Sequence, residues 1–372
     1  MNHSKQKLKI AIPALALLGF GAYAFMNRPK FGKRPSGKRK LELNNSPHYR
    51  SGAFHNLSHT PSFTEGATYF SVLKKFLFEK NENARPKAEI PSVKTDLHKW
   101  KPEENILVWF GHSSYFMQID GKKILVDPVF SGHASPIKLT TSAFPGSNYY
   151  TAEDIPEIDY LFITHDHWDH LDYETITKLQ PKIKKIITGL GTGEHLESWG
   201  FDRDIIIEKD WYQKEVLEDN FVVNAVPARH FSGRNFKRNT VLWTSFALRT
   251  PSFNIFLGGD SGYDSHFKEA GESFGPFDLA ILENGQYNQD WKYIHMMPEE
   301  TLQAAHDLRA ARLLPVHNSK FALAKHSWYE PLESISSLHK NGKMQLLTPL
   351  IGEKVYLNNP DQQFTKWWRN VF

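Results

Sequence analysis

The sequence predicts a layered α/β body with two sheets and helices on the outside. Apolar runs with the length and composition of strands recur from residue 105 onward. Helix-like segments alternate with many of these runs, which is typical of sheets covered by helices. Four of the predicted strands are followed at once by His or Asp side chains, so this fold would collect polar groups at one edge of its sheets.

The elements follow one another from Asn105. Three strands at 106–110, 114–119 and 123–126 are joined by Gly111-His112 and by Asp120-Gly121, a strong hairpin-turn pair. A strand at 159–163 comes next. Helices near 173–179 and 193–199 then alternate with strands at 185–188 and 205–207, and strands at 214–217 and 221–226 form a hairpin around 218–220.

The segment from Thr164 to His170 carries the strongest chemical signal. It has the pattern His165-x-His167-x-Asp169-His170 directly after an apolar strand. A strand that ends in such a tight loop can aim alternate side chains at two points a few ångströms apart. Imidazole nitrogens and carboxylate oxygens are zinc ligands, so this segment is interpreted as half of a dinuclear metal site.

Other strand ends offer the remaining ligands. Strand 221–226 runs into His230, strand 254–257 runs into Gly259-Asp260, and strand 312–316 runs into His317. Cysteine is absent from the 372 residues, so a metal would be held by His, Asp and Glu alone.

Charge is unevenly distributed along the chain. The net charge is +4, but residues 1–40 contain ten Lys and Arg and no acid. The remaining 35 basic and 41 acidic residues give the rest a net charge of −6. This argues against nucleic acid as a partner and for a basic head that meets anionic lipids.

Between the basic clusters lies an apolar stretch of 17 residues from Ile10 to Met26. It matches a short membrane anchor or a signal-peptide core cleaved near Ala22-Tyr23-Ala24. The basic block that follows favours an uncleaved anchor and leaves the cytoplasmic or periplasmic side undecided. The predicted divisions are an anchor at 1–27, a basic tether and extension at 28–100, and the body at 101–372. Within the extension, residues 63–78 predict a helix that faces either a membrane or the body.

The order of these motifs resembles the metallo-β-lactamase superfamily. The matching pieces are the 165–170 motif, His230, Gly259-Asp260-Ser261-Gly262 and His317. The segments 109–114, 164–172, 259–263, 293–300 and 317–323 further resemble the branch of phospholipases D that hydrolyse N-acyl-phosphatidylethanolamine. The resemblance implies a four-layer αβ/βα sandwich.

The resemblance also implies residue roles. One metal would be held by His165, His167 and His230, a second by Asp169, His170 and His317, and Asp260 would bridge them. This donor set suits two Zn²⁺ ions, with iron or manganese as alternatives. His295 would contact the phosphate or protonate the leaving alcohol, so Asp169, Asp260 and His295 are the predicted catalytic residues.

The predicted reaction is attack of a metal-bridging hydroxide on the phosphorus of a phosphodiester, because two cations neutralise the charge that builds there. A membrane-associated phospholipase D acting on N-acyl-phosphatidylethanolamine is the first hypothesis. A lactonase or soluble phosphodiesterase with the same site is the second, and a membrane-tethered binding protein is the third. The resemblance suggests a homodimer. Asp127 would orient a ligand histidine, Asp166 would point away from the metals, and His195 would be a surface histidine.

Overall fold

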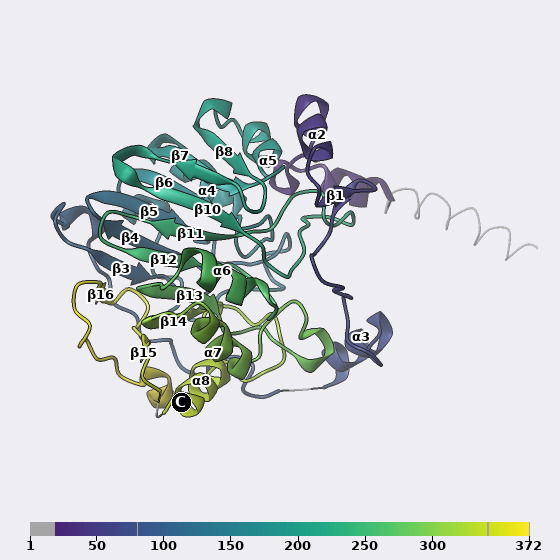
Figure 1. Cartoon of the computed structure of the whole chain (residues 1–372). Coiled ribbons are helices and arrows are strands. Elements are labelled where there is room, and N and C mark those ends of the chain that lie inside the picture. The colour runs from purple at the N-terminus through teal and green to yellow at the C-terminus, as the bar shows by residue number, and fades with distance from the viewer. Residues whose placement is uncertain (1–18, 80, 341, 372) are drawn as a thin grey trace, which may run out of the picture.

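Two seven-stranded sheets form the body of the protein in the computed structural model, which describes residues 19–79, 81–340 and 342–371 (Figure 1). The first sheet has the order β16 (Lys354–Tyr356), β3 (Ile106–Trp109), β4 (Tyr115–Ile119), β5 (Lys122–Val126), β6 (Ile158–Ile163), β7 (Ile183–Gly189) and β8 (Ile206–Lys209). The second has the order β15 (Gln345–Leu346), β14 (Arg312–Val316), β13 (Leu279–Glu283), β12 (Asn254–Leu257), β11 (Ser245–Arg249), β10 (Val222–Val226) and β9 (Lys214–Val216).

Each sheet is mixed. Strands β3, β4 and β5 pair as an antiparallel meander, and β5 to β8 pair in parallel. The predicted turn between β4 and β5 is confirmed, because Asp120 and Gly121 both have positive φ, as a tight hairpin turn requires. In the second sheet, β9 to β12 are antiparallel and β12 to β15 are parallel.

Side chains alternate between two apolar layers along each strand. In β6, Tyr160 and Phe162 pack toward the second sheet, and Leu161 and Ile163 pack under the outer helices. These outer helices are α4 (Tyr173–Leu179) and α5 (Gly193–Ser198) over the first sheet. Over the second sheet they are α6 (His266–Phe274), α7 (Pro298–Asp307) and α8 (Glu330–Leu338). The predicted α/β class, with two sheets between outer helices, is therefore confirmed.

The segment before the body is folded onto it, so the prediction that the division 28–100 begins with a tether is wrong. This segment contains η1 (Pro29–Phe31), α2 (Gly37–Asn44), β1 (Tyr49–Arg50) and β2 (Ala53–Phe54). Phe31, Leu43 and Phe54 are buried against the body. Its few apolar residues lack periodicity, and their partners are supplied by distant parts of the chain, so the local pattern did not reveal the packing.

The predicted membrane anchor is not supported by a described helix. Residues 10–18 of the apolar stretch lie outside the described residues, and residues 19–26 are helical. None of the helices in the described ranges is long and apolar enough to cross a bilayer. The helix expected within 63–78 is confirmed as α3 (Tyr69–Phe78), which begins at a Thr68 cap and projects at one side of the molecule (Figure 1).

Candidate metal centre

The loops that follow β6, β10, β12 and β14 bring their His and Asp side chains together at one edge of the sandwich. After β6, the Thr164 amide and hydroxyl donate to the two carboxylate oxygens of Asp127 at 2.9 and 2.6 Å. The His170 amide then closes a turn onto the His167 carbonyl at 3.1 Å. This tight turn directs alternate side chains of the motif to two neighbouring points, as the spacing predicted.

One group of potential ligands consists of His165, His167, His230 and Asp260, whose ligand atoms all lie within 4.8 Å of one another. His165 Nε2 lies 2.9 Å from His167 Nδ1, and His230 Nε2 lies 3.2 Å from the same atom. The three histidines are those that the sequence assigned to one metal, and they come from two different sheets.

A second group consists of His112, Asp169, His170 and His317. His112 Nε2 lies 2.9 Å from Asp169 Oδ2, so this histidine belongs to the site. The backbones of His112 and His317 are paired, with the His317 amide donating to the His112 carbonyl at 2.9 Å, and both residues have positive φ. Such backbone conformations persist where surrounding contacts enforce them and are frequent at functional sites.

Asp260 lies between the two groups. Its Oδ2 is 3.2 Å from His170 Nε2 and 3.7 Å from His230 Nε2, and its Oδ1 is 3.1 Å from His317 Nδ1. One carboxylate therefore reaches ligands of both groups, which is the position that a bridging ligand needs.

The chemistry of these groups fits bound cations. Within the described ranges, the buried His167 Nε2 has no hydrogen-bond partner, and the contacts of His170 Nε2 and Asp260 Oδ1 with their neighbours at 3.2 and 3.1 Å lack the geometry of a hydrogen bond. Buried polar atoms in this state are costly unless a ligand completes them. Burial and the neighbouring imidazoles hold the pKa of His165, His230 and His317 well below the usual value, so these rings are neutral, as metal ligands must be. Burial likewise lowers the pKa of His167 to about 4.

His170 behaves differently from the other imidazoles. Burial favours its neutral form, but the carboxylates of Asp260, Asp169 and Asp127 outweigh burial and raise its pKa well above the usual value. A cation bound among these carboxylates would displace that proton, because a ligating imidazole is neutral. The donor set therefore fits two divalent metal ions, and it does not select zinc over iron or manganese.

His295 lies in the segment between β13 and α7 and belongs to a third group of possible ligands, which adds His295 and Glu283 to Asp260 of the first group and His317 of the second. Its Nδ1 lies 2.5 Å from the buried Oε2 of Glu283, and its ring centre lies 5.0 Å from that of His230. Glu283 also accepts from the amides of Met296 and Ser261 through Oε1, at 2.8 and 3.3 Å. Burial raises the pKa of Glu283 well above its usual value. Sequence reasoning missed this residue, although it ends an apolar strand at the same edge.

Two carboxylates near the site, Asp127 and Asp166, lie as the sequence predicted. Asp127 Oδ2 is 2.8 Å from His170 Nδ1, so it orients that ring. Asp172 caps α4 by accepting from the Glu174 amide. Asp166 turns away from the two groups toward His195, at 3.2 Å. The prediction that His195 is a surface residue is wrong, because it is only 3% exposed beneath the N-terminal segment.

An open cavity of about 330 Å³ has this centre as its floor. His167, Asp169, His230, Asp260, His295 and His317 line the floor, and the walls include Phe63, Phe231, Arg238, Trp291, Ile294 and Leu323. Part of one wall comes from the N-terminal extension. Asn56 accepts from the His230 amide through Oδ1 at 3.1 Å and donates to the His230 carbonyl through Nδ2 at 2.8 Å.

Arg234 contributes indirectly, from beneath the metal loop. It follows His230 in sequence, but it is buried and cannot meet a head group. Its guanidinium donates to the carbonyls of Asp166 and Leu171, at 2.9 and 2.6 Å, and stacks 4.0 Å from the Trp168 ring centre. Arg234 therefore supports the loop that carries the ligands.

Residues 122–318 match the family described as "Beta-lactamase superfamily domain". The chain is 37% identical over 328 residues to an uncharacterized protein of Mycobacterium tuberculosis, covering 87% of this chain and 88% of that protein. It is 29% identical over 280 residues to N-acyl-phosphatidylethanolamine-hydrolyzing phospholipase D 1 of Caenorhabditis elegans, covering 67% of this chain and 77% of that protein.

The fold is similar to that of a metallo hydrolase from Ignicoccus hospitalis, with a TM-score of 0.51 and 23% identity, covering 68% of this chain and 97% of that chain. The family match spans all members of the two ligand groups except His112, which lies before its first residue. The chain therefore belongs to the β-lactamase superfamily, as a metallo-hydrolase of that fold.

Proposed function

We propose that this protein is a dinuclear metal-dependent phosphodiesterase that hydrolyses N-acyl-phosphatidylethanolamine-like phospholipids at the phospholipase D position. The observation that carries the proposal is the composition of the cavity. Its floor presents members of both ligand groups, and its walls combine apolar side chains with the cation of Arg238. A phosphodiester attached to acyl chains matches such a cavity better than a small uncharged substrate does. The similarity to the nematode phospholipase D supports the same substrate class.

Two divalent cations bound here would polarise a phosphoryl oxygen and supply an activated water near neutral pH. The protein's own residues would orient the substrate and protonate the leaving alcohol. Glu283 engages Nδ1 of His295, so Nε2 is the ring nitrogen left for the substrate. From that position His295 would donate a hydrogen bond to the phosphate or a proton to the leaving alcohol. Arg238 would attract the anionic head group.

Purified full-length protein should be incubated with vesicles that contain N-acyl-phosphatidylethanolamine, and its metal content should be measured in the same preparation. We expect about two metals per chain, as the two ligand groups imply, with release of N-acylethanolamine and phosphatidic acid. The second candidate, a lactonase or soluble phosphodiesterase, would show the same metal content without lipid cleavage. A protein without stoichiometric metal would instead favour the binding-protein hypothesis.

The variant His295→Ala separates chemistry from metal binding. We expect turnover to fall about 100-fold or more, which is the usual contribution of a positioned acid or base, while both metals stay bound. His306→Ala is a matched control, because His306 is an exposed histidine on α7. Loss of metal from His295→Ala would contradict the assigned role and make His295 a ligand.

A further inference from the structure

Two loop tips expose large apolar side chains almost completely. Leu139 is 93% exposed and Phe236 is 94% exposed, on the loops 136–140 and 233–239. Each is flanked by exposed cations, namely Lys138 beside Leu139, and Lys237 with Arg238 beside Phe236. An aromatic or aliphatic tip next to basic side chains is the composition of a segment that lies in a membrane interface.

The two tips are tied to the same stretch of the N-terminal segment. Lys30 donates through Nζ to the Pro136 carbonyl at the base of one loop. Arg34 donates to Asn235 Oδ1 at 3.1 Å in the other loop. Both loops therefore lie next to the residues that follow the helix at 19–26, on which Phe20 and Tyr23 are 69% and 68% exposed.

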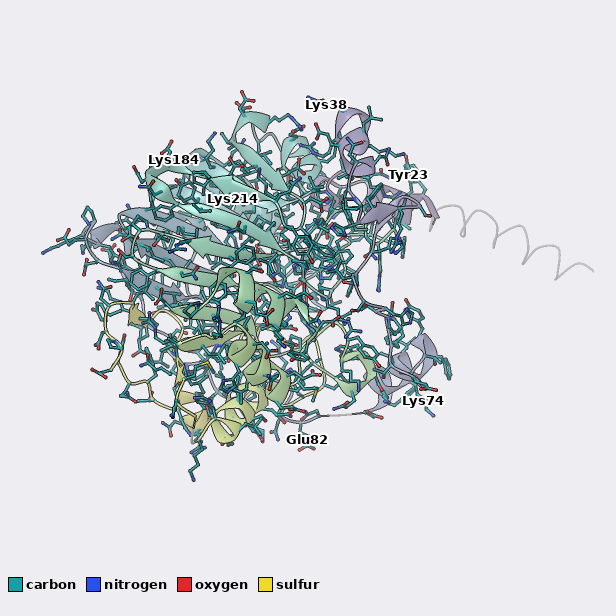
Figure 2. All side chains as sticks on the ribbon, viewed as in Figure 1. Tyr23, Lys38, Lys74, Glu82, Lys184 and Lys214 are labelled. Carbon is teal, nitrogen blue, oxygen red and sulfur yellow. The ribbon has the colours of Figure 1, made fainter. Side chains whose placement is uncertain are left out.

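Helix α3 exposes further apolar side chains close to the cavity. Phe70 and Leu73 are 77% and 55% exposed. Tyr69 packs edge-on against Phe63, with ring centres 4.8 Å apart, and Phe63 lines the cavity above the metal centre. Figure 2 shows Tyr23 and Lys74 on the same side of the molecule. Arg238, two residues after Phe236, also lines the cavity, so the loop that carries Phe236 borders the cavity.

We propose that these side chains form one membrane-docking surface, the apolar rim, defined as Phe20, Tyr23, Phe70, Leu73, Leu139 and Phe236. The rim inserts into the interface of an anionic lipid bilayer and places the mouth of the cavity against the lipid head groups. This inference rests on the proposed function, because it names the surface from which that site would take its substrate. It requires no spanning helix.

The positive charge around the apolar rim favours a lipid bilayer, and not a second copy of the chain, as the partner of this surface. Exposed cations surround the rim, including Arg28, Lys33, Lys74 and Lys237. A second copy would present the same positive charges and repel them, whereas each cation near an anionic bilayer surface adds attraction. The rim is also discontinuous, made of loop tips and one side of a helix, which suits shallow insertion between head groups more than a flat protein interface.

The absence of cysteine allows a direct test on the full chain. An environment-sensitive fluorophore is attached to one introduced cysteine per variant. The rim variants are Leu139→Cys and Phe236→Cys, and the control is Val216→Cys. Val216 is 63% exposed on β9, and Figure 2 shows its neighbour on that strand, Lys214, away from Tyr23 and Lys74. The vesicles contain phosphatidylcholine with phosphatidylglycerol and lack N-acyl-phosphatidylethanolamine.

We expect the two rim labels to shift to shorter wavelength when vesicles are added and to be quenched by nitroxide-labelled lipids, while the Val216 label stays unchanged. Unchanged spectra at both rim positions would overturn the inference. A shift that depends on protein concentration and occurs without vesicles would also overturn it, by making the rim an interface between copies.

A binding measurement complements the labels. The double variant Leu139→Ser/Phe236→Ser should bind the anionic vesicles about 100-fold more weakly, since each buried large apolar side chain contributes about tenfold. Val216→Ser/Tyr356→Ser is the matched control, and thermal unfolding verifies that both variants are folded. Equal binding by both variants would overturn the inference.

Because these vesicles contain no substrate, the experiment tests membrane insertion independently of lipid hydrolysis. Insertion without lipid hydrolysis supports the rim and contradicts the proposed substrate. Hydrolysis of N-acyl-phosphatidylethanolamine without insertion contradicts the rim and leaves the proposed function standing.

Discussion

Glu283 shows how one buried side chain can determine the behaviour of another. It is fully buried at the end of β13, yet it makes contacts in three directions, to His295 and to the amides of Met296 and Ser261. A carboxyl group in that position costs free energy unless each oxygen is hydrogen-bonded. Its contacts fix the ring of His295 and the loop that carries Asp260 in one arrangement.

We expect Glu283→Gln to lower kcat about 10- to 100-fold, which is the typical cost of losing a residue that orients an active-site histidine. The amide keeps the size of the side chain but cannot exchange a proton with His295 Nδ1. Steady-state kinetics on a soluble phosphodiester, with metal analysis, measure the effect. Glu299→Gln, an exposed neighbour on α7, is the control. Wild-type kcat in Glu283→Gln would contradict the positioning role, and loss of metal would identify Glu283 as a ligand.

Lys320 is a second buried group with a measurable consequence. It is 1% exposed and donates through Nζ to the carbonyls of Phe110 and Val129, at 3.2 and 2.9 Å. These contacts hold the backbone before His112 next to the backbone after His317. Burial lowers the pKa of Lys320 to about 7.

The lowered pKa predicts a pH-dependent stability difference between wild type and Lys320→Met. Below about pH 7 both the folded and unfolded chains carry the proton, so the full cost of burying the charge is present. From about pH 7 to the ordinary value of 10.5 the unfolded chain binds more protons than the folded chain. The unfolding free energy of wild type relative to Lys320→Met should therefore rise with pH, by up to about 1.4 kcal/mol per unit.

Urea unfolding of the two metal-loaded proteins at several pH values between about 6 and 10 measures this slope. Lys343→Met, at an exposed lysine, should show no such trend against wild type. A flat difference between wild type and Lys320→Met would show that Lys320 titrates near its ordinary pKa.

At the scale of elements, α2 is held to the body by one ion-pair cluster. Arg39 is 4% exposed and donates to Glu194, Glu197 and Glu208, at 2.9, 2.7 and 2.7 Å. Two of these carboxylates belong to α5 and the third to β8. The cluster joins the N-terminal extension to the first sheet, and the extension in turn supplies Asn56 and Phe63 to the site.

We expect Arg39→Ala to destabilise the protein by on the order of 3 kcal/mol, because it leaves three partly buried carboxylates close together without their common partner. Lys38→Ala should be nearly neutral, since that side chain is 84% exposed one residue away. Urea unfolding measures the difference, and limited proteolysis shows whether residues 29–45 loosen first. Equal stability of the two variants would mean that the apolar contacts of Phe31 and Leu43 suffice.

At the scale of the whole molecule, the metal centre connects the two halves of the sandwich. Strands of the first sheet are followed by His112, His165, His167, Asp169 and His170. Strands of the second sheet are followed by His230, Asp260 and His317. Each ligand group contains residues from both sheets. A cation bound in either group would therefore tie the sheets together at this edge.

Removal of metal by a chelator should abolish hydrolysis and lower the thermal unfolding midpoint by at least about 5 °C, since a ligand bound far above its Kd contributes several kcal/mol to the folded state. Scanning calorimetry before and after adding back Zn²⁺ measures the effect. His306→Ala should respond to the chelator as wild type does, and His317→Ala should respond less. An unchanged midpoint after verified metal loss would mean that packing alone holds the sheets.

The elements of the body could be predicted because their patterns are local. Residues 160–163 of β6 are a continuous apolar run buried on both faces, and the turn Asp120-Gly121 requires only two residues. The packing of the N-terminal extension could not be predicted, because Arg39 is buried only by virtue of three glutamates that lie more than 150 residues away. The burial of His195 could not be predicted for the same reason, because its partner Asp166 and the residue packed over it, Gly32, are distant in sequence.

The α/β class, the seven candidate ligand residues and the resemblance to the superfamily can all be inferred from the sequence alone, because each depends on a short motif or on periodicity within one strand. Three other relations become visible only in the folded chain: His112 joins the second ligand group, Glu283 contacts His295, and the N-terminal extension forms part of the cavity wall. These relations join residues far apart in the chain, and distances between such residues exist only after the two sheets have packed.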